Sequence, residues 1–223
     1  MNDTIPNQTV CHVLDRVVTL EVFTSDQCKN IIDNGLNNWT EKKSMIKGNE
    51  EKGEEEYVED LDYRVTDIFV PSKSVFDNLS DKQSEKSYEG ELTEYILSTI
   101  LRFNQSEEGY GFDIDGMIEL PTLMRYQSSE IHPKGKSGKY DWHMDIGEGT
   151  TALRKLSYSI LLNAGEYEGG ELEFHIGRDT HSPFSSEIGN MILFPSYLVH
   201  KITPVTKGVR YAMVGWVHGN SFK

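Results

Sequence analysis

The sequence of 223 residues predicts an α+β protein that is mostly β, with a β-sandwich or jelly-roll core in its second half. Two observations predict this class. Apolar residues with helical spacing lie before Gly109. After Gly109, short apolar runs rich in β-branched and aromatic residues follow one another, separated by Gly, Pro, Asn and Asp. Many short strands with few helices are typical of sandwiches and jelly rolls.

The N-terminal part of the chain predicts a strand followed by a helix. Apolar residues over 9–24 end in the period-two alternation of a strand. Thr24 or Ser25 is suited to cap the next segment, because a short hydroxyl side chain accepts hydrogen bonds from free amides at a helix start. Cys28 begins an apolar stripe at helical spacing. We therefore expect a helix over residues 25–38.

The rest of the first half predicts a loop, a strand and a second helix in turn. Residues 42–60 lack an apolar face, and the run 50–56 carries five glutamates that repel one another. We expect a solvated loop there, with closure over a bound substrate as the alternative role. Residues 62–70 alternate polar and apolar side chains, which predicts a strand. From Ser87 to Phe103 the apolar residues keep a period near 3.6, which predicts a helix.

The second half of the chain predicts at least six short strands. The helices of the first half are expected to pack against the outer face of this β structure. No repeat and no low-complexity linker separates the halves. We therefore expect one domain over 1–223, with strands and supporting helices in 1–118 and a jelly-roll core in 119–218. The predicted strands are Met117–Leu120, Leu123–Tyr126, Lys155–Leu162, Glu171–Phe174, Met191–Phe194 and Arg210–Val217.

Composition and charge exclude several classes of function. No apolar run approaches the ~20 residues that span a bilayer, and the first residues lack the basic and apolar regions of a signal peptide. We expect a cytoplasmic protein with no membrane partner, in which Cys11 and Cys28 are buried thiols. The net charge of −14 opposes binding to nucleic acid. A neutral or basic substrate suits this charge better.

His143 and Asp145 form a candidate metal pair. On a strand, residues i and i+2 project from the same face, so both side chains can reach one ion while Met144 points away. Chance alone supplies roughly 0.4 such pairs in a chain with this content of His and Asp, so the pair needs support. His200 is the best third ligand, because it lies between two β-like runs. Two histidines and one carboxylate are typical of ferrous oxygenases, but zinc hydrolases also use them.

Arg210 adds a candidate anion site. It stands ten residues after His200, at the start of the last predicted strand. A guanidinium held among apolar strands needs an anion, and its planar fork matches a carboxylate in two parallel hydrogen bonds. The simpler interpretation is an ion pair with one of the 36 acidic side chains.

The ordered set His143-x-Asp145, His200 and Arg210 resembles the iron(II)/2-oxoglutarate-dependent dioxygenases, in particular the prolyl 4-hydroxylase-like branch. The resemblance covers about residues 119–218. Flanking segments that strengthen it are Tyr140–Asp145, Ser159–Asn163, Gly169–Leu172 and Phe194–Pro195. It implies a double-stranded β-helix, which is the jelly roll of these enzymes.

The resemblance also implies roles for individual residues. His143, Asp145 and His200 would bind Fe(2+), and Arg210 would bind the distal carboxylate of 2-oxoglutarate. Tyr126 stands where the family often places a tyrosine near this cosubstrate, although the segment that follows it is longer than usual. Tyr140 is a second candidate for that role, and Trp216 shares the strand parity of Arg210 and would line the same pocket.

The implied activity is hydroxylation of an unactivated C–H bond, most simply in a prolyl residue of a peptide or protein. O2 would be the second cosubstrate, and ascorbate is a further candidate cofactor. A carboxylate at Asp145 favours hydroxylation, since related halogenases have a small residue there. The alternatives are the same chemistry on another side chain or a small molecule, and a metal-binding jelly roll without catalysis.

Overall fold

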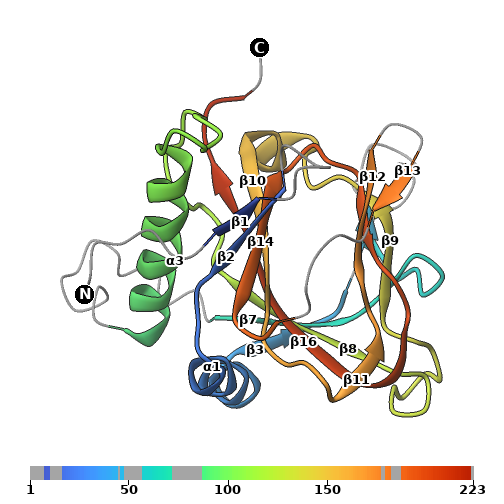
Figure 1. The fold of residues 1–223 in the computed structure, drawn as a ribbon. Helices are drawn as coiled ribbons and strands as arrows, with labels where there is room; N and C mark the ends of the chain where they lie inside the picture. The colour runs from blue at the N-terminus through green and yellow to red at the C-terminus, as the bar shows by residue number, and fades with distance from the viewer. Residues whose placement is uncertain are drawn as a thin grey trace.

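The computed structural model describes residues 8–10, 17–44, 46–47, 57–71, 87–176, 179–181 and 187–221. Two antiparallel sheets face each other, and two long helices lie outside the larger sheet (Figure 1). This is the mostly β jelly-roll arrangement with supporting N-terminal helices that the sequence predicts. Within the described residues, no helix combines the length and the apolarity needed to cross a bilayer.

Both predicted helices are present, and both begin at the expected residues. In α1 (Ser25–Asn38) the Thr24 side chain accepts from the Gln27 amide at 3.3 Å, and the Gln27 side chain accepts from the Thr24 amide at 2.9 Å. This reciprocal capping box satisfies two amides that the first turn leaves free. In α3 (Tyr88–Asn104) the Ser87 hydroxyl accepts from the Gly90 amide at 3.1 Å.

The larger sheet has nine strands, and its central strands come from the second half of the chain. Its order is β1 (Gln8–Val10), β2 (Val18–Glu21), β14 (Asn190–Pro195), β10 (Arg154–Leu161), β16 (Val205–His218), β8 (Thr122–Gln127), β7 (Asp67–Val70) and β3 (Thr40–Lys42), with β11 (Tyr167–Gly169) paired to β16.

The smaller sheet has five strands and carries one edge of the candidate site. Its order is β13 (Asp179–His181), β12 (Leu172–Ile176), β15 (His200–Ile202), β9 (Lys139–His143) and β6 (Arg64–Val65). A separate pair joins β4 (Ile46–Lys47) to β5 (Tyr57–Val58), and a short 3-10 helix spans Gly149–Leu153.

Two local predictions need correction. Residues 42–60 were expected to be loop throughout, but β4 and β5 pair within them; the acidic run 50–56 lies outside the described residues, as does Cys11. Residues 117–120 were expected to form a strand, but only Gly116 makes a single bridge, to His218. Gly116 has a φ of 140°, so the backbone there does not continue in the extended conformation of a strand.

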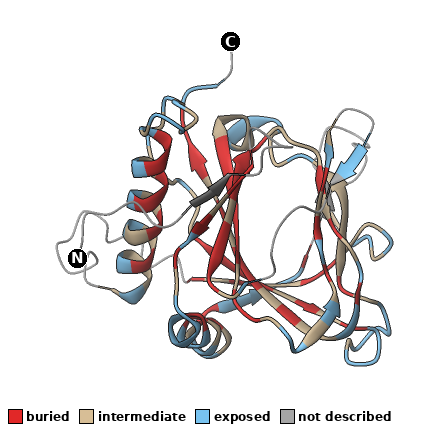
Figure 2. Ribbon diagram, in the orientation of Figure 1, coloured by how far each residue is buried: buried red, intermediate tan, exposed pale blue. Residues whose placement is uncertain are grey.

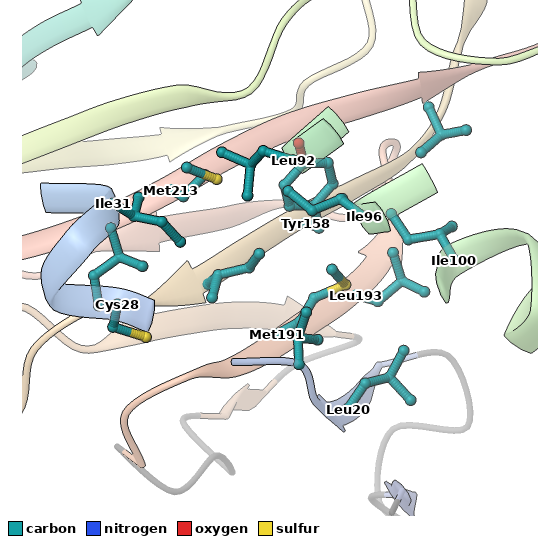
Figure 3. Close-up of a cluster of buried hydrophobic side chains, with 14 of the residues drawn as sticks. Leu20, Cys28, Ile31, Leu92, Ile96, Ile100, Tyr158, Met191, Leu193 and Met213 are labelled. Carbon is teal, nitrogen blue, oxygen red and sulfur yellow. The ribbon is translucent and has the colours of Figure 1, made fainter. Parts of the chain in front are cut away.

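The larger sheet is buried on both faces because its strands alternate between two cores. Leu123 and Met213 belong to the cluster that packs against α1 and α3, whereas Met124 and Tyr126 belong to the cluster between the sheets. Figure 2 shows that the buried positions concentrate on the strands and on the inner sides of the helices. Figure 3 shows Ile31, Ile96 and Ile100 facing the sheet residues of the outer cluster. The helices therefore cover the outer face of the sheet, as predicted.

Truncation of the α3 core should destabilise the fold strongly. Ile96 has an exposed fraction of 0% in the outer cluster. Ile96→Ala should lower the free energy of unfolding by about 2–5 kcal/mol, since it removes buried methyl groups and leaves a cavity. Glu94→Ala, at an exposed position of the same helix, should change it by less than about 0.5 kcal/mol. Urea titration measures both, and equal losses would contradict this packing.

Candidate metal centre

The register between β9 and β15 brings together two histidines that are distant in the sequence. The Cα of His200 lies opposite the Cα of His143 in this antiparallel pair. The Nε2 atom of His143 lies 3.7 Å from Oδ1 of Asp145, and the Nε2 atom of His200 lies 3.5 Å from Oδ2 of the same carboxylate. One ligand atom from each of the three residues lies within 4.8 Å of the other two. Two atoms that each bind one ion at about 2.1 Å lie no more than about 4.2 Å apart, and the separations of 3.7 Å and 3.5 Å meet this limit, so the cluster fits a single metal.

Backbone carbonyls fix the orientation of both imidazoles. The Nδ1 atom of His143 lies 2.7 Å from the Asp141 carbonyl oxygen, and that of His200 lies 2.9 Å from the Leu198 carbonyl oxygen. A carbonyl only accepts, so each Nδ1 carries the proton and each Nε2 lone pair is directed to the cluster. Burial, together with the neighbouring His200, lowers the pKa of His143 to about 4. At neutral pH the ring is therefore in the neutral form that binds metals.

Asp145 reaches the cluster from just beyond the strand, which differs from the prediction. The strand β9 ends at His143, and the Asp145 amide donates to the Ser196 carbonyl oxygen at 3.0 Å. Met144 points away with an exposed fraction of 52%. Burial opposes ionisation of Asp145, but the two imidazoles and a hydrogen bond from Ser157 outweigh it, so its pKa lies below the ordinary value. The carboxylate is therefore ionised at neutral pH.

Arg210 faces the same cavity from the larger sheet, and no carboxylate of the described residues pairs with its charge. Its Cα lies opposite that of Tyr126 on β8, and its guanidinium carbon lies 5.4 Å from the Tyr126 ring centroid. The side chain is buried, and its Nε and Nη1 atoms have no hydrogen-bond partner. Unpaired buried donors on a cation cost several kcal/mol, so this position fits an anionic ligand. The ion pair offered as the simpler interpretation of Arg210 is not formed with any described residue.

All seven predicted site residues line one cavity of about 190 Å³ between the two sheets. Tyr140 stacks on His143 with 3.5 Å between ring centroids. Burial raises the pKa of Tyr140 to about 12, so its phenol stays protonated. Trp216 lines the same cavity from the same strand as Arg210, as strand parity predicted. The residues are His143, Asp145, His200, Arg210, Tyr126, Tyr140 and Trp216.

A network of hydrogen bonds and ion pairs beside the cavity was not predicted from the sequence. Arg154 lies over the Trp216 ring at 3.6 Å and donates to the Asp145 carbonyl oxygen at 3.0 Å. Its guanidinium also donates to the Glu119 carboxylate at 2.7 Å and 2.5 Å, and this bidentate pair fixes its plane. Arg154 was not singled out from the sequence, although it immediately precedes the predicted strand 155–162.

His218 completes this network. Its exposed fraction is 1%. Its Nδ1 accepts from the Ile118 amide at 3.2 Å, so Nε2 carries the proton and donates to Glu119 at 3.0 Å. Burial opposes ionisation of Glu119, but the bonds from His218 and Arg154 outweigh it and hold the pKa of Glu119 at about 2.

Comparison with known proteins identifies the class that this fold and this cluster define. Residues 122–218 match the 2OG-Fe(II) oxygenase superfamily, so this segment of the chain is a domain of that superfamily. The matched segment holds β8 to β16 and therefore includes His143, Asp145, His200 and Arg210. Glu119 lies just before it.

Individual relatives agree with this family. A PKHD-type hydroxylase from Synechococcus sp. strain CC9605 is 32% identical over 105 residues, which cover 46% of this chain and 47% of that protein. The match therefore spans about half the length of this curated relative.

Solved structures show the same fold across nearly the whole chain. A prolyl-4-hydroxylase from Pseudomonas putida has a TM-score of 0.57 at 14% identity, covering 92% of this chain and 93% of that one. A Trichoplax adhaerens prolyl hydroxylase, solved with a hypoxia inducible factor peptide fragment, has a TM-score of 0.58 at 16% identity, covering 92% and 84%.

Glu119 should give the protein a measurable acid sensitivity. Its pKa is about 2 in the folded protein against 4.5 ordinarily, so between these values the unfolded state binds more protons. The stability that it contributes is present above about pH 4.5 and is lost as the pH falls toward about 2. Urea titrations of the wild type and of Glu119→Gln should therefore differ more at about pH 6 than at about pH 3. A difference independent of pH would contradict this ion-pair network.

Proposed function

We propose that the protein is an Fe(II)/2-oxoglutarate-dependent dioxygenase that hydroxylates a C–H bond of a peptide or protein, with a prolyl residue as the target. The single observation that carries the proposal is the buried Arg210, which has two unpartnered nitrogens and lines the same cavity as the cluster of His143, Asp145 and His200. The cavity thus offers one site for a cation and one for an anion, which is what a ferrous ion and a dicarboxylic keto acid require.

The chain offers a complete set of protein ligands for the metal. His143, Asp145 and His200 would hold the ion through two neutral imidazoles and one carboxylate, leaving its other positions open. When bound, the ferrous ion and the keto acid supply the chemistry that couples oxidative decarboxylation to succinate with insertion of one oxygen atom into a C–H bond. Because a dicarboxylic keto acid needs a cation at its far end, the buried Arg210 in the same cavity favours the oxygenase over a zinc hydrolase.

Arg210 would orient the keto acid from its far end. Its planar fork accepts a carboxylate in two parallel hydrogen bonds, and the Tyr126 ring beside it limits where that carboxylate can lie. Arg210 and Tyr126 are both buried, which strengthens these contacts. Burial keeps the Tyr140 phenol protonated, and Tyr126, Trp216 and Arg154 also line the cavity.

A peptide or protein substrate is supported by comparison. The Trichoplax prolyl hydroxylase shares this fold and was solved with a peptide. The curated relative named above is a hydroxylase. We therefore place the prolyl residue first among substrates, and the test is a mass gain of one oxygen on proline-containing peptides incubated with Fe(II), 2-oxoglutarate and oxygen. Mass gain on alanine-for-proline peptides instead would contradict the choice of proline.

Loss of one metal ligand should abolish cofactor binding. Protein with Fe(II) and 2-oxoglutarate should show a weak visible charge-transfer band without oxygen, and it should release succinate when oxygen is admitted. His143→Ala should remove the band and reduce succinate by at least about a hundredfold, since only two protein ligands remain. His175→Ala, an exposed position on β12, is the matched control and should keep both. An unchanged band in His143→Ala would refute the assignment of this ligand.

Loss of the arginine should act on cosubstrate binding. Arg210→Ala should weaken 2-oxoglutarate binding by about 2–5 kcal/mol, because a buried charge-assisted contact is lost. In steady-state kinetics the KM for 2-oxoglutarate should rise far more than kcat falls. Arg102→Gln removes an exposed arginine on α3, outside the cavity, and should leave the KM unchanged. An Arg210→Ala enzyme with the wild-type KM would contradict the proposed role.

A further inference from the structure

A second arginine, Arg64, borders the same cavity without an anion. It lies on the edge strand β6 with its Cα opposite that of Tyr140 on β9. Its guanidinium carbon lies 4.3 Å from the Tyr140 ring centroid, and Tyr140 in turn stacks on His143. Arg64 therefore lies one aromatic ring away from the candidate metal cluster.

The contacts of Arg64 leave its hydrogen-bonding capacity largely unused. Among the described residues its buried Nε has no partner, and the one hydrogen bond that it forms joins Nη2 to the Met124 sulfur at 3.9 Å. A thioether is a weak acceptor, and a guanidinium offers five N–H donors. The contact with the Tyr140 ring is electrostatic and satisfies none of these donors.

Acidic side chains near β6 are engaged elsewhere. Asp67 accepts from the Arg125 Nε at 2.8 Å, and Asp62 pairs with the Lys136 Nζ at 3.2 Å. Arg64 forms no ion pair with any carboxylate in the described part of the chain. Arg154, the third arginine of the cavity, is matched by Glu119.

The charges of the loaded site leave Arg64 unmatched. A ferrous ion, the Asp145 carboxylate, a keto acid dianion and Arg210 together carry no net charge, and Arg154 with Glu119 carries none. Only the charge of Arg64 then lacks a counterpart among the described residues that line the cavity. A partly buried cation is stabilised by a nearby anion. The substrate, which enters after the keto acid, would therefore bind more favourably if it carried an anionic group.

The position of Arg64 suits an incoming substrate better than the keto acid. Arg64 borders both the cavity and an outer groove of about 440 Å³, lined also by Glu59, His132 and Lys134. It therefore stands at a boundary between the cavity and the surface, on an edge strand, whereas Arg210 lies on the central strand β16.

We propose that Arg64 is a substrate-binding residue, which pairs with a carboxylate of the molecule to be hydroxylated. This inference rests on the proposed function and narrows its substrate to acidic compounds. The carboxylate belongs either to an acidic side chain beside the target residue in a peptide or to a free amino acid. Although the whole chain carries a charge of −14, the cavity is locally cationic and selects an anion.

Binding of matched probes tests this without turnover. The protein is loaded with Mn(II) and saturated with N-oxalylglycine, an unreactive analogue of the keto acid, and probes are titrated by calorimetry. One pair is acetyl-Glu-Pro-Gly-amide and acetyl-Gln-Pro-Gly-amide, and the other is L-proline and L-prolinamide. In at least one pair the carboxylate member should bind about ten- to a hundredfold more tightly, as expected for a charge-assisted contact. The pair that responds identifies the source of the carboxylate.

Variants assign the preference to Arg64. Arg64→Gln should reduce the preference to about unity while leaving N-oxalylglycine affinity within about twofold, and Arg64→Lys, which keeps the charge, should retain part of it. Arg102→Gln is the control and should keep the wild-type preference. Thermal melts check that each variant folds. If Arg64→Gln does not fold, the Arg64→Lys variant still tests the inference, because added salt should screen its contact with the probe carboxylate and reduce the preference.

Three outcomes would overturn the inference. They are no preference in either pair, a preference that survives Arg64→Gln, and a loss confined to N-oxalylglycine affinity, which would assign Arg64 to the keto acid. Failure of the wild type to bind N-oxalylglycine at all would instead contradict the proposed function, and with it this inference.

Discussion

The register of β15 on β9 is the constraint on which the candidate site depends. It sets His200 opposite His143, although 56 residues separate them in the sequence and the intervening chain builds strands of both sheets. The carbonyls of Asp141 and Leu198 then fix both rings, so that each Nε2 is directed to Asp145. A shift of this pairing by one residue would send one imidazole to the other face of the sheet.

The two sheets contribute opposite halves of the site. The smaller sheet and the turn after β9 supply the cation ligands, and β16 of the larger sheet supplies the anion-binding Arg210. Burying an unpaired charge is unfavourable, so the fold must offset it elsewhere. The offset comes from the outer core, where α1 and α3 bury apolar side chains against the same sheet. Stability and function thus reside on opposite faces of one sheet.

The sequence predicted those features whose signals are local. Both helices were predicted because Thr24 and Ser87 cap regular apolar stripes, and the candidate ligands because His143 and Asp145 lie two residues apart. The network beside the cavity was not predicted, since Glu119 meets Arg154 and His218 only through folding, across 35 and 99 residues. The apolar residues 117–120 resembled a strand because composition alone does not reveal that only Gly116 bridges a neighbour. From the sequence, Arg64 was interpreted as one polar position of an alternating strand. Only the structure shows that it lies against Tyr140 and forms no ion pair with a described carboxylate.

The central claim is that His143, Asp145 and His200 share one metal ion beside a keto acid held by Arg210. An anomalous-difference map from oxygen-free crystals grown with Mn(II) and 2-oxoglutarate tests it most directly. The account predicts one strong peak bonded to both Nε2 atoms and to the Asp145 carboxylate, with the far carboxylate of the keto acid on the Arg210 guanidinium. A peak elsewhere, or a keto acid that leaves Arg210 without a partner, would contradict it.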